Sequence, residues 1–173
     1  SSSVNKAQSD SGALMQGLPV GPIPGINEVE YVGTLLQVMM FVIQKATSQN
    51  TIPTPEQLAG LRNNQHPQAQ FLWATFRDVF HYCAINLQLI ADNARDLDFA
   101  VRWGFGWDSG PFEIWQAAGW QQVAGWIAAD IAAGKTMSDM PLPGWVTDPV
   151  RTDVHDLRGS YAPLQRTQQP RSA

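Results

Sequence analysis

The clearest pattern of hydrophobic and polar positions begins at Pro67 and predicts a long amphipathic helix. Apolar residues recur there at spacings of three and four, which places them along one face of an α-helix. The apolar positions are Leu72, Phe76, Phe80, Cys83, Leu87 and Ile90. The polar residues fall largely on the other faces, and they are Arg77, Asp78, His81, Gln88 and Asp92. We therefore expect one buried face, with the cysteine on it.

Three shorter helices are predicted after the long one, with glycines between them. The segment from Gly104 to Gly110 separates the first two. Pro111 suits the first position of a helix, where its missing N–H has no partner in any case, and Glu113 then falls at the third position. Glycines after the later helices favour a stop at those points. The expected helices run from about Asp96 to Trp103, from Pro111 to Gly119 and from Trp120 to Gly134.

The N-terminal part of the chain has a different character. Residues 1–27 are rich in Ser, Gly and Pro, which predicts a linker or tail. A run of Val, Leu, Met, Phe and Ile follows from Glu28 to Lys45, with Asn27 as its expected N-cap. We expect a helix there, and a strand is the competing interpretation for Val38 to Ile43. Because the run is apolar nearly all round, it should pack on two sides or lie in an interface.

The C-terminal part is predicted to be extended. Five prolines occur after Met140, with scattered charge between them, and no alternation is long enough to indicate a sheet. The expected fold class is therefore all-α, with about four to five helices and a long irregular Pro-rich C-terminal tail. The expected organisation is a linker or tail at 1–27, an apolar helix plus linker at 28–55, a helical domain at 56–140 and an extended linker at 141–173.

Composition narrows the class of protein. Charged residues make up only 15% of the chain, and there are seven Trp and seven Phe, so either other protein covers part of the surface or the core is well filled. The net charge is −4 and the basic residues are scattered, which argues against nucleic-acid binding. The lone Cys83 excludes an internal disulfide framework. The apolar run at 31–43 is shorter than a membrane span, and no signal-peptide pattern opens the sequence, so we expect a soluble, cytoplasmic protein.

Few residues indicate chemistry by themselves. No histidine lies at a metal-ligand spacing from another histidine or from the cysteine, so no metal site is expected. His81 follows Asp78 by three residues, a pair that general base catalysis can use but that more often has no catalytic task. Gly104-Phe105-Gly106 begins like a dinucleotide fingerprint. However, Ser109 occupies the place of the third glycine and a helix precedes the motif instead of a strand, so we reject that interpretation.

The glycine-rich corner carries a family resemblance. Residues 102–119, RWGFGWDSGPFEIWQAAG, resemble the G-F-G-x-x-x-G-P-F-E segment of the C-terminal domain of 3-hydroxyacyl-CoA dehydrogenases. The upstream HPQAQFLWATFRDVFHYCAINLQLIADNARDLDFAV resembles the helix that leads into that segment. Together with PLPGWV and GSYAP further on, the sequence is most similar to bacterial proteins that fuse such a dehydrogenase to an enoyl-CoA hydratase. The resemblance covers about two thirds of the chain, from about Glu56.

The resemblance implies an architectural role. The family oxidises an L-3-hydroxyacyl-CoA in fatty-acid β-oxidation with NAD, and its His–Glu pair and Rossmann glycines belong to an N-terminal domain. We therefore assign no catalytic residue here, and NAD belongs to the parent enzyme. In the family this corner contributes to the acyl pocket and to dimer contacts, although the present chain looks like a second copy of the helical domain. The matching acyl-pocket or domain-interface candidates are Phe105, Trp107, Pro111 and Phe112.

The implied partners are the dehydrogenase and hydratase domains of the parent protein, acyl-CoA, and a second copy of the chain. The alternative function is a stand-alone helical interaction module without catalytic activity, in which the aromatic corner and the apolar helix dock a partner protein. A third interpretation, an autonomous enzyme that uses His81, depends on the His81–Asp78 pair alone.

Overall fold

Six helices and a small sheet make up residues 54–170, the part of the chain that the computed structural model describes. The helix expected over 28–45 lies outside these residues. The strands form one antiparallel sheet in the order β1-β2-β3. The helices are α3 (Pro55–Asn63), α4 (Pro67–Ile90), α5 (Ala94–Phe105), α6 (Pro111–Ala117), α7 (Trp120–Ala132) and α8 (Gly144–Thr147), and the strands are β1 (His155–Asp156), β2 (Gly159–Ala162) and β3 (Thr167–Gln169).

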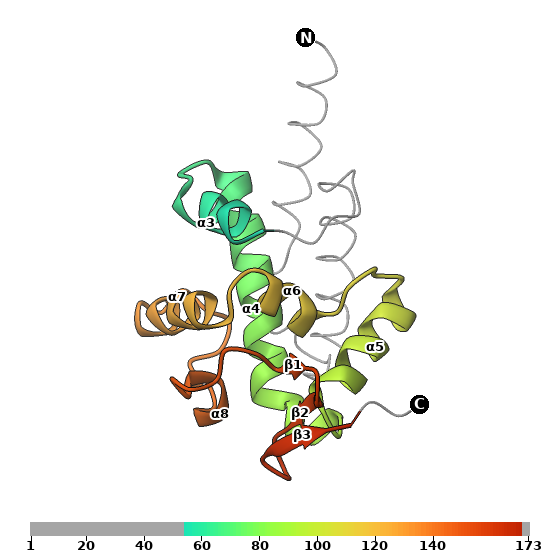
Figure 1. Cartoon of the computed structure of the whole chain (residues 1–173). Coiled ribbons are helices and arrows are strands. Elements are labelled where there is room, and N and C mark those ends of the chain that lie inside the picture. Colours follow the sequence, from blue (N-terminus) through green and yellow to red (C-terminus); the bar gives the residue numbers. More distant parts are fainter. Residues whose placement is uncertain (1–53, 171–173) are drawn as a thin grey trace, which may run out of the picture. The chain divides into compact units, whose positions relative to one another are not determined.

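The long helix α4 is the central element, and α3, α5 and α6 pack directly against it (Figure 1). It begins where the hydrophobic pattern predicted, with Pro67 in the first turn and the His66 side chain accepting a hydrogen bond from the Gln68 N–H at 3.2 Å. Most of the predicted apolar face is buried, which confirms the amphipathic helix. Its last turn departs from the prediction, because Ile90 is exposed.

A ladder of aromatic rings connects the elements around α4. Phe80 of α4 stacks on Trp115 of α6 at a centroid distance of 5.4 Å, and Trp115 stacks on Trp120 of α7 at 4.2 Å. Trp145 of α8 continues the series at 6.0 Å from Trp120, and Tyr161 of β2 ends it at 5.3 Å from Trp145. Each such ring pair contributes about 0.5–1.5 kcal/mol beyond the burial of its surface. The ladder therefore makes one core out of helices and sheet.

A buried ion pair joins α4 to α7. Arg77 lies 3.3 Å from Asp130, and the Trp73 indole N–H donates to the same carboxylate at 2.8 Å. Arg77 also pairs with its neighbour Asp78 at 3.0 Å. The sequence pattern placed Arg77 on the polar side of the helix, and this was wrong because a carboxylate on another helix compensates its burial. Removing one member of such a pair costs about 3–5 kcal/mol.

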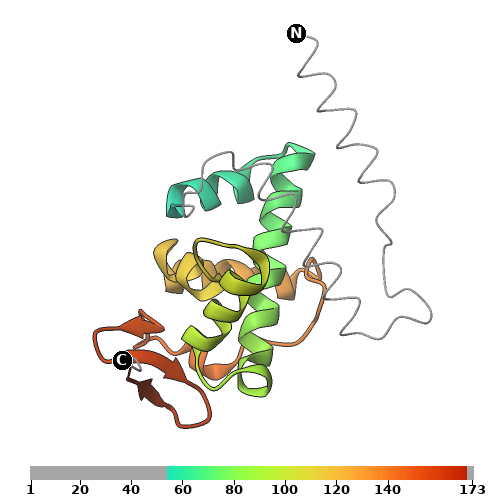
Figure 2. The ribbon, with the colours of Figure 1, turned by 90° about the vertical axis from the view of Figure 1, so that its right-hand side faces the viewer.

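The C-terminal part is folded, which corrects the expectation of an extended tail and of a purely α-helical fold. Val146, Val154 and Tyr161 are buried, and all four residues of β2 are buried as well. Figure 2 shows the sheet at the end of the chain, where β2 packs against α5. A Cβ on Gly159, whose φ is +141°, would lie 1.7 Å from the Gln169 carbonyl oxygen. Strands of two to four residues are too short for a sequence pattern to detect an alternation of apolar and polar positions.

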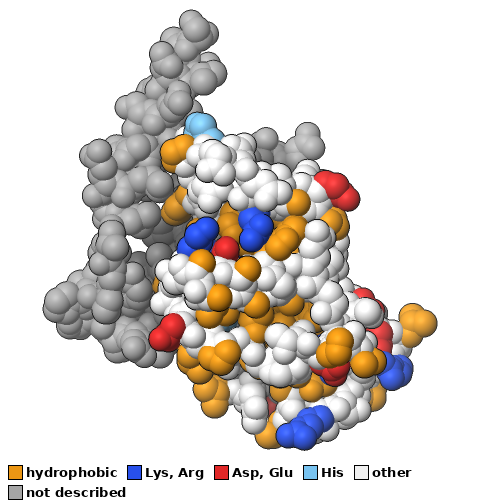
Figure 3. All heavy atoms as spheres, turned by 90° about the vertical axis from the view of Figure 1, so that its left-hand side faces the viewer, with side chains coloured by type: hydrophobic (Ala, Val, Ile, Leu, Met, Phe, Trp, Pro, Cys, Tyr) orange, Lys and Arg blue, Asp and Glu red, His pale blue; other side chains and the backbone are white. Residues whose placement is uncertain are grey.

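Apolar side chains reach the surface of the molecule at several places. On the face formed by α3, α7 and α8, hydrophobic side chains reach the surface between polar ones (Figure 3). None of the helices between residues 54 and 170 combines the length and the apolar character that crossing a bilayer requires. Of the seven tryptophans, Trp73, Trp115 and Trp120 are buried, whereas Trp103 is 80% exposed. The aromatic content therefore serves both a well-filled core and an exposed patch.

We predict that Cys83 resists labelling in the folded protein. Its thiol is buried on α4, and burial raises its pKa well above the ordinary value. A reagent therefore has little access to the sulfur, and little of the reactive thiolate is present. A disulfide exchange reagent in excess should react slowly without denaturant and at the rate of a free cysteine in unfolding concentrations of urea. Rapid labelling of the native protein would contradict this placement.

Candidate functional site

The corner between α5 and α6 separates the four residues that the sequence singled out. Phe112 and Pro111 are buried in the core at the start of α6. Phe105 is 39% exposed at the end of α5, and Trp107 is partly exposed in the loop after it. The chain turns between them at Gly106, whose φ of +71° favours glycine. Two of the four residues are therefore buried in the core, and the other two lie nearer the surface.

Phe105 lines an open groove between the C-terminal end of α4 and α5. The groove has a volume of about 650 Å³. Its charged lining residues are Asp92 and Asp96. Its apolar lining includes Leu89, Ile90, Leu97, Val101 and Phe105.

Asp98 of α5 supplies the cap that α6 lacks. Gly110 stands at the N-cap position of α6 and has no side chain to accept a hydrogen bond from the first turn. The fully buried Asp98 carboxylate takes over this task, accepting from the Phe112 N–H at 2.8 Å and from the Glu113 N–H at 3.2 Å. Glu113 closes the turn by accepting from the Gly110 N–H at 2.7 Å. A tertiary contact thus performs what a local cap usually does.

The same contact explains why position 110 holds glycine. Its φ is −78°, so no strained backbone requires glycine there. A Cβ at this position would lie 2.2 Å from the Cβ of Asp98 and 2.4 Å from its Oδ1. Gly110 is needed because the carboxylate of α5 must approach the backbone of α6 this closely.

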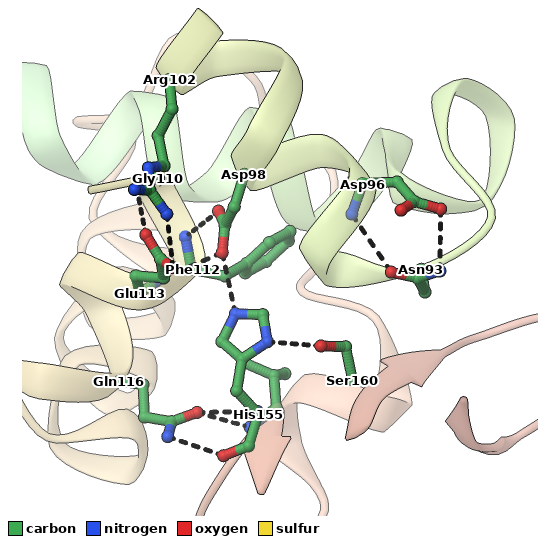
Figure 4. A network of polar contacts seen from close by, with 11 residues as sticks. Asn93, Asp96, Asp98, Arg102, Gly110, Phe112, Glu113, Gln116, His155 and Ser160 are labelled. Atoms are coloured by element: carbon green, nitrogen blue, oxygen red, sulfur yellow. Dashed lines mark hydrogen bonds and ion pairs between the residues drawn. The ribbon is translucent and has the colours of Figure 1, made fainter. Parts of the chain in front are cut away.

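His155 of β1 joins this cap to the sheet (Figure 4). Its Nε2 lies 2.8 Å from Asp98 Oδ2, and its Nδ1 lies 2.8 Å from the hydroxyl oxygen of Ser160 on β2. An ionised carboxylate only accepts hydrogen bonds. With His155 neutral, Nε2 therefore carries the ring hydrogen, and the Ser160 hydroxyl donates to Nδ1.

The electrostatics of Asp98 reflect two opposing effects. Burial raises the pKa of this carboxyl above its ordinary value, and the hydrogen bond from His155 opposes that rise.

Gln116 of α6 fixes the backbone beside the histidine. Its side-chain oxygen accepts from the N–H groups of Val154 and His155, both at 2.9 Å, and its amide donates to the His155 carbonyl at 2.9 Å. Asp98 and Ser160 thus hold the ring of His155, and Gln116 holds its backbone.

A serine, a histidine and an aspartate in series are the components of a nucleophilic relay, but this arrangement lacks the other requirements. Ser160 is 3% exposed and lies on a strand whose four residues are all buried. Both oxygens of Asp98 are engaged by α6. In a working relay the nucleophile needs a reachable substrate carbonyl and free oxyanion donors. The geometry instead ties three elements together, and we assign it a structural role.

The proposed His81–Asp78 pair does not form. His81 is buried, and its Nε2 lies 2.7 Å from the Met140 carbonyl oxygen, to which it donates. Asp78 pairs with Arg77 instead. Within residues 54–170, no three His, Cys, Asp or Glu side chains gather as a metal site would require. His81 thus anchors the chain after α7, and no carboxylate among the described residues pairs with it for base catalysis.

Sequence reasoning missed Asp98, Gln116, His155 and Ser160. One signal for the first was present, because a helix that begins with Gly110-Pro111 has no capping side chain of its own and must receive one from elsewhere. Nothing in the sequence indicated that the acceptor would be Asp98, which lies twelve residues earlier on the preceding helix. The histidine and serine come from a sheet that the pattern did not predict.

Comparison with known proteins found a similar protein whose name agrees with the family resemblance. Over 79 residues, the chain is 37% identical to a probable 3-hydroxyacyl-CoA dehydrogenase of Bacillus subtilis (strain 168). The match points to the dehydrogenase family. It covers 46% of this chain but only 9% of the relative, so the chain spans a small part of the protein that it resembles. No family model and no solved structure matches the chain.

We predict that Asp98→Ala destabilises the protein by about 2–4 kcal/mol. The change removes a helix cap, worth about 1 kcal/mol, and leaves the buried Phe112 N–H without a partner, which costs about 1–3 kcal/mol more. Asp96→Ala is the matched control on the same helix, because its carboxylate accepts from the Asn93 side chain at the start of α5 itself, and it should cost about 1 kcal/mol. Urea denaturation followed by tryptophan fluorescence measures both values, and equal losses would contradict the capping role.

We also predict that Gly110→Val costs at least about 3 kcal/mol and Gly110→Ala about 1–3 kcal/mol, since either side chain displaces Asp98. Gly125→Ala is the control. Position 125 lies inside α7 with no neighbour within 4 Å of an added Cβ, so alanine should stabilise there by about 0.5–1 kcal/mol. Thermal melts and urea curves of the three variants give the comparison. An unchanged melting temperature for the valine variant would overturn the proposed contact.

Proposed function

We propose that this chain is the helical C-terminal part of an NAD-dependent L-3-hydroxyacyl-CoA dehydrogenase of fatty-acid β-oxidation, in a polypeptide that also carries an enoyl-CoA hydratase. Its role there is architectural: it closes the dehydrogenase half, backs the acyl-CoA site and joins the hydratase half. The observation that carries the proposal is the 37% identity over 79 residues with a probable 3-hydroxyacyl-CoA dehydrogenase.

The geometry of the corner supports a structural role better than a catalytic one. The segment that resembles the dehydrogenases holds Phe112 in the core and uses Asp98 and His155 to lock α5, α6 and the sheet. Phe105 is the aromatic candidate that also lines a groove, so it is the residue through which this segment would back an acyl chain. NAD binding and the chemical step belong to other domains of the parent enzyme.

A chimera tests the proposal directly. The 79 matching residues of the Bacillus subtilis relative are replaced by those of this chain, and NADH formation from a 3-hydroxyacyl-CoA and NAD is measured. We expect a folded, active chimera, because the exchanged part supplies architecture. The same chimera with Asp98→Ala should lose activity and show a larger fall in melting temperature than with Asp96→Ala, which should keep its activity. A chimera that folds with the wild-type melting temperature but forms no NADH would contradict the architectural role.

The isolated chain should form no NADH from 3-hydroxyacyl-CoA and NAD. We predict this because His81 donates to a backbone carbonyl and has no carboxylate partner in the part of the chain that the structure describes. Absorbance at the NADH band gives the result. Turnover by the isolated chain that disappears in the His81→Ala variant would favour an autonomous enzyme instead.

The second candidate function is a stand-alone helical interaction module. It is favoured by the large apolar side chains that α4 and α5 expose, among them Leu89 and Trp103. The reading frame around this segment separates the two proposals: dehydrogenase and hydratase sequences on either side support the fused enzyme, and their absence supports the module.

A further inference from the structure

Two methionines stand three residues apart in the loop that follows α7. Met137 and Met140 are each 54% exposed, so about half of each side chain meets solvent. The chain contains five methionines, and the other three precede residue 54. We call the segment from Lys135 to Met140 the methionine loop. Because a thioether reacts at its sulfur, the exposure of these two side chains makes the loop a candidate for covalent modification.

Backbone groups of both methionines hold the methionine loop on α4. The Met140 carbonyl oxygen accepts from His81 Nε2 at 2.7 Å, and the Met137 N–H donates to Asp78 Oδ1 at 3.4 Å. Within the loop, the Ser138 hydroxyl oxygen accepts from the Met140 N–H at 3.2 Å. None of these three contacts uses a sulfur atom, so a chemical change at either sulfur leaves them in place.

The remaining sulfur of residues 54–170 is shielded. Cys83 lies on the buried face of α4 and is 5% exposed. A cysteine reacts with oxidants as its thiolate, and burial keeps the pKa of this thiol well above its ordinary value. A thioether has no proton to lose, so its reactivity depends on access to the sulfur. In this part of the chain, the methionine loop therefore presents the sulfurs that an oxidant in solution reaches first.

We propose that the methionine loop is a reversible oxidation site whose oxidant is a peroxide. The sulfur lone pair attacks one peroxide oxygen, the O–O bond breaks, and the sulfur keeps that oxygen as a sulfoxide. With hydrogen peroxide, the displaced hydroxide takes the proton of the transferred oxygen and leaves as water. The sulfur thus loses two electrons, and the peroxide gains them. A reductase supplied with a dithiol reverses the step, because the dithiol becomes a disulfide and the oxygen leaves as water.

Oxidation at this site changes the surface and keeps the fold. A thioether is apolar, whereas a sulfoxide is polar and accepts hydrogen bonds. The loop therefore alternates between an apolar and a polar surface, while His81 and Asp78 keep their contacts with its backbone. This inference is independent of the proposed enzymatic function, because it needs only residues of the present chain.

Mass spectrometry of the full chain after a brief exposure to hydrogen peroxide tests the proposal. Trypsin releases residues 136–151, which contain both methionines, and residues 78–95, which contain Cys83. In the native protein, Met137 and Met140 should each gain one oxygen atom at a rate within about threefold of the rate in urea, because their sulfurs are already accessible. Cys83 should oxidise at least about tenfold more slowly in the native protein than in urea. Fragment ions distinguish the methionines from Trp145 in the same peptide.

Leucine variants are the matched controls, since leucine keeps the volume of the side chain and has no sulfur. Met137→Leu and Met140→Leu should each leave one oxidised methionine in the peptide, and the double variant should leave none. After oxidation, the wild-type chain and the double variant should melt within about 4 °C of each other, because the loop is held through its backbone. Reductases for both sulfoxide epimers, with dithiothreitol, should remove both oxygen atoms from the native protein.

Four results would overturn the proposal. The first is native oxidation of either methionine that is more than about threefold slower than oxidation in urea. The second is a Cys83 that oxidises in the native protein as fast as in urea. The third is a fall in melting temperature on oxidation that the wild-type chain shows and the double variant does not. The fourth is a sulfoxide in the loop that the two reductases leave in place.

Discussion

The contact between the Asp98 carboxylate and the first turn of α6 is the constraint on which the rest of the structure depends. It fixes the angle between α5 and α6, and it requires a glycine at position 110. Through His155 it also fixes the sheet, because the ring that donates to Asp98 accepts from Ser160. One buried charge thus organises residues that are separated by sixty-two positions in the sequence. Such a charge is tolerated only because three N–H groups point at it.

The aromatic ladder contributes stabilising energy, whereas the polar network around Asp98 fixes how the elements are oriented. Rings from α4, α6, α7, α8 and β2 stack in one series, so the short C-terminal elements, which would not fold alone, gain a core to pack on. The polar network determines the relative orientation of the elements, and the aromatic ladder makes their packing favourable. This division of labour explains how strands of two to four residues become buried and ordered.

The sequence predicted the helices well and the site poorly, for physical reasons. The period of apolar residues from Leu72 to Leu87 reports a helix directly, and Pro111 and Gly134 mark helix ends through their own backbone preferences. Arg77 was misplaced because its partner, Asp130, is fifty-three residues away. The sheet was missed because a strand buried on all its residues, such as β2, shows no alternation. Asp98 and His155 acquire their roles only from contacts between distant elements, which no local pattern contains.

The aromatic ladder also has a consequence for folding during synthesis. The ribosome delivers Trp115 and Trp120 before Trp145 and Tyr161, and the last ring follows Trp120 by forty-one residues. At a synthesis rate of about 5–20 residues per second, Tyr161 is added roughly 2–8 s after Trp120. Within this part of the chain, the nascent polypeptide therefore presents bare indole surface to chaperones until β2 has emerged. A stop codon placed just after Met140 would make that transient state permanent.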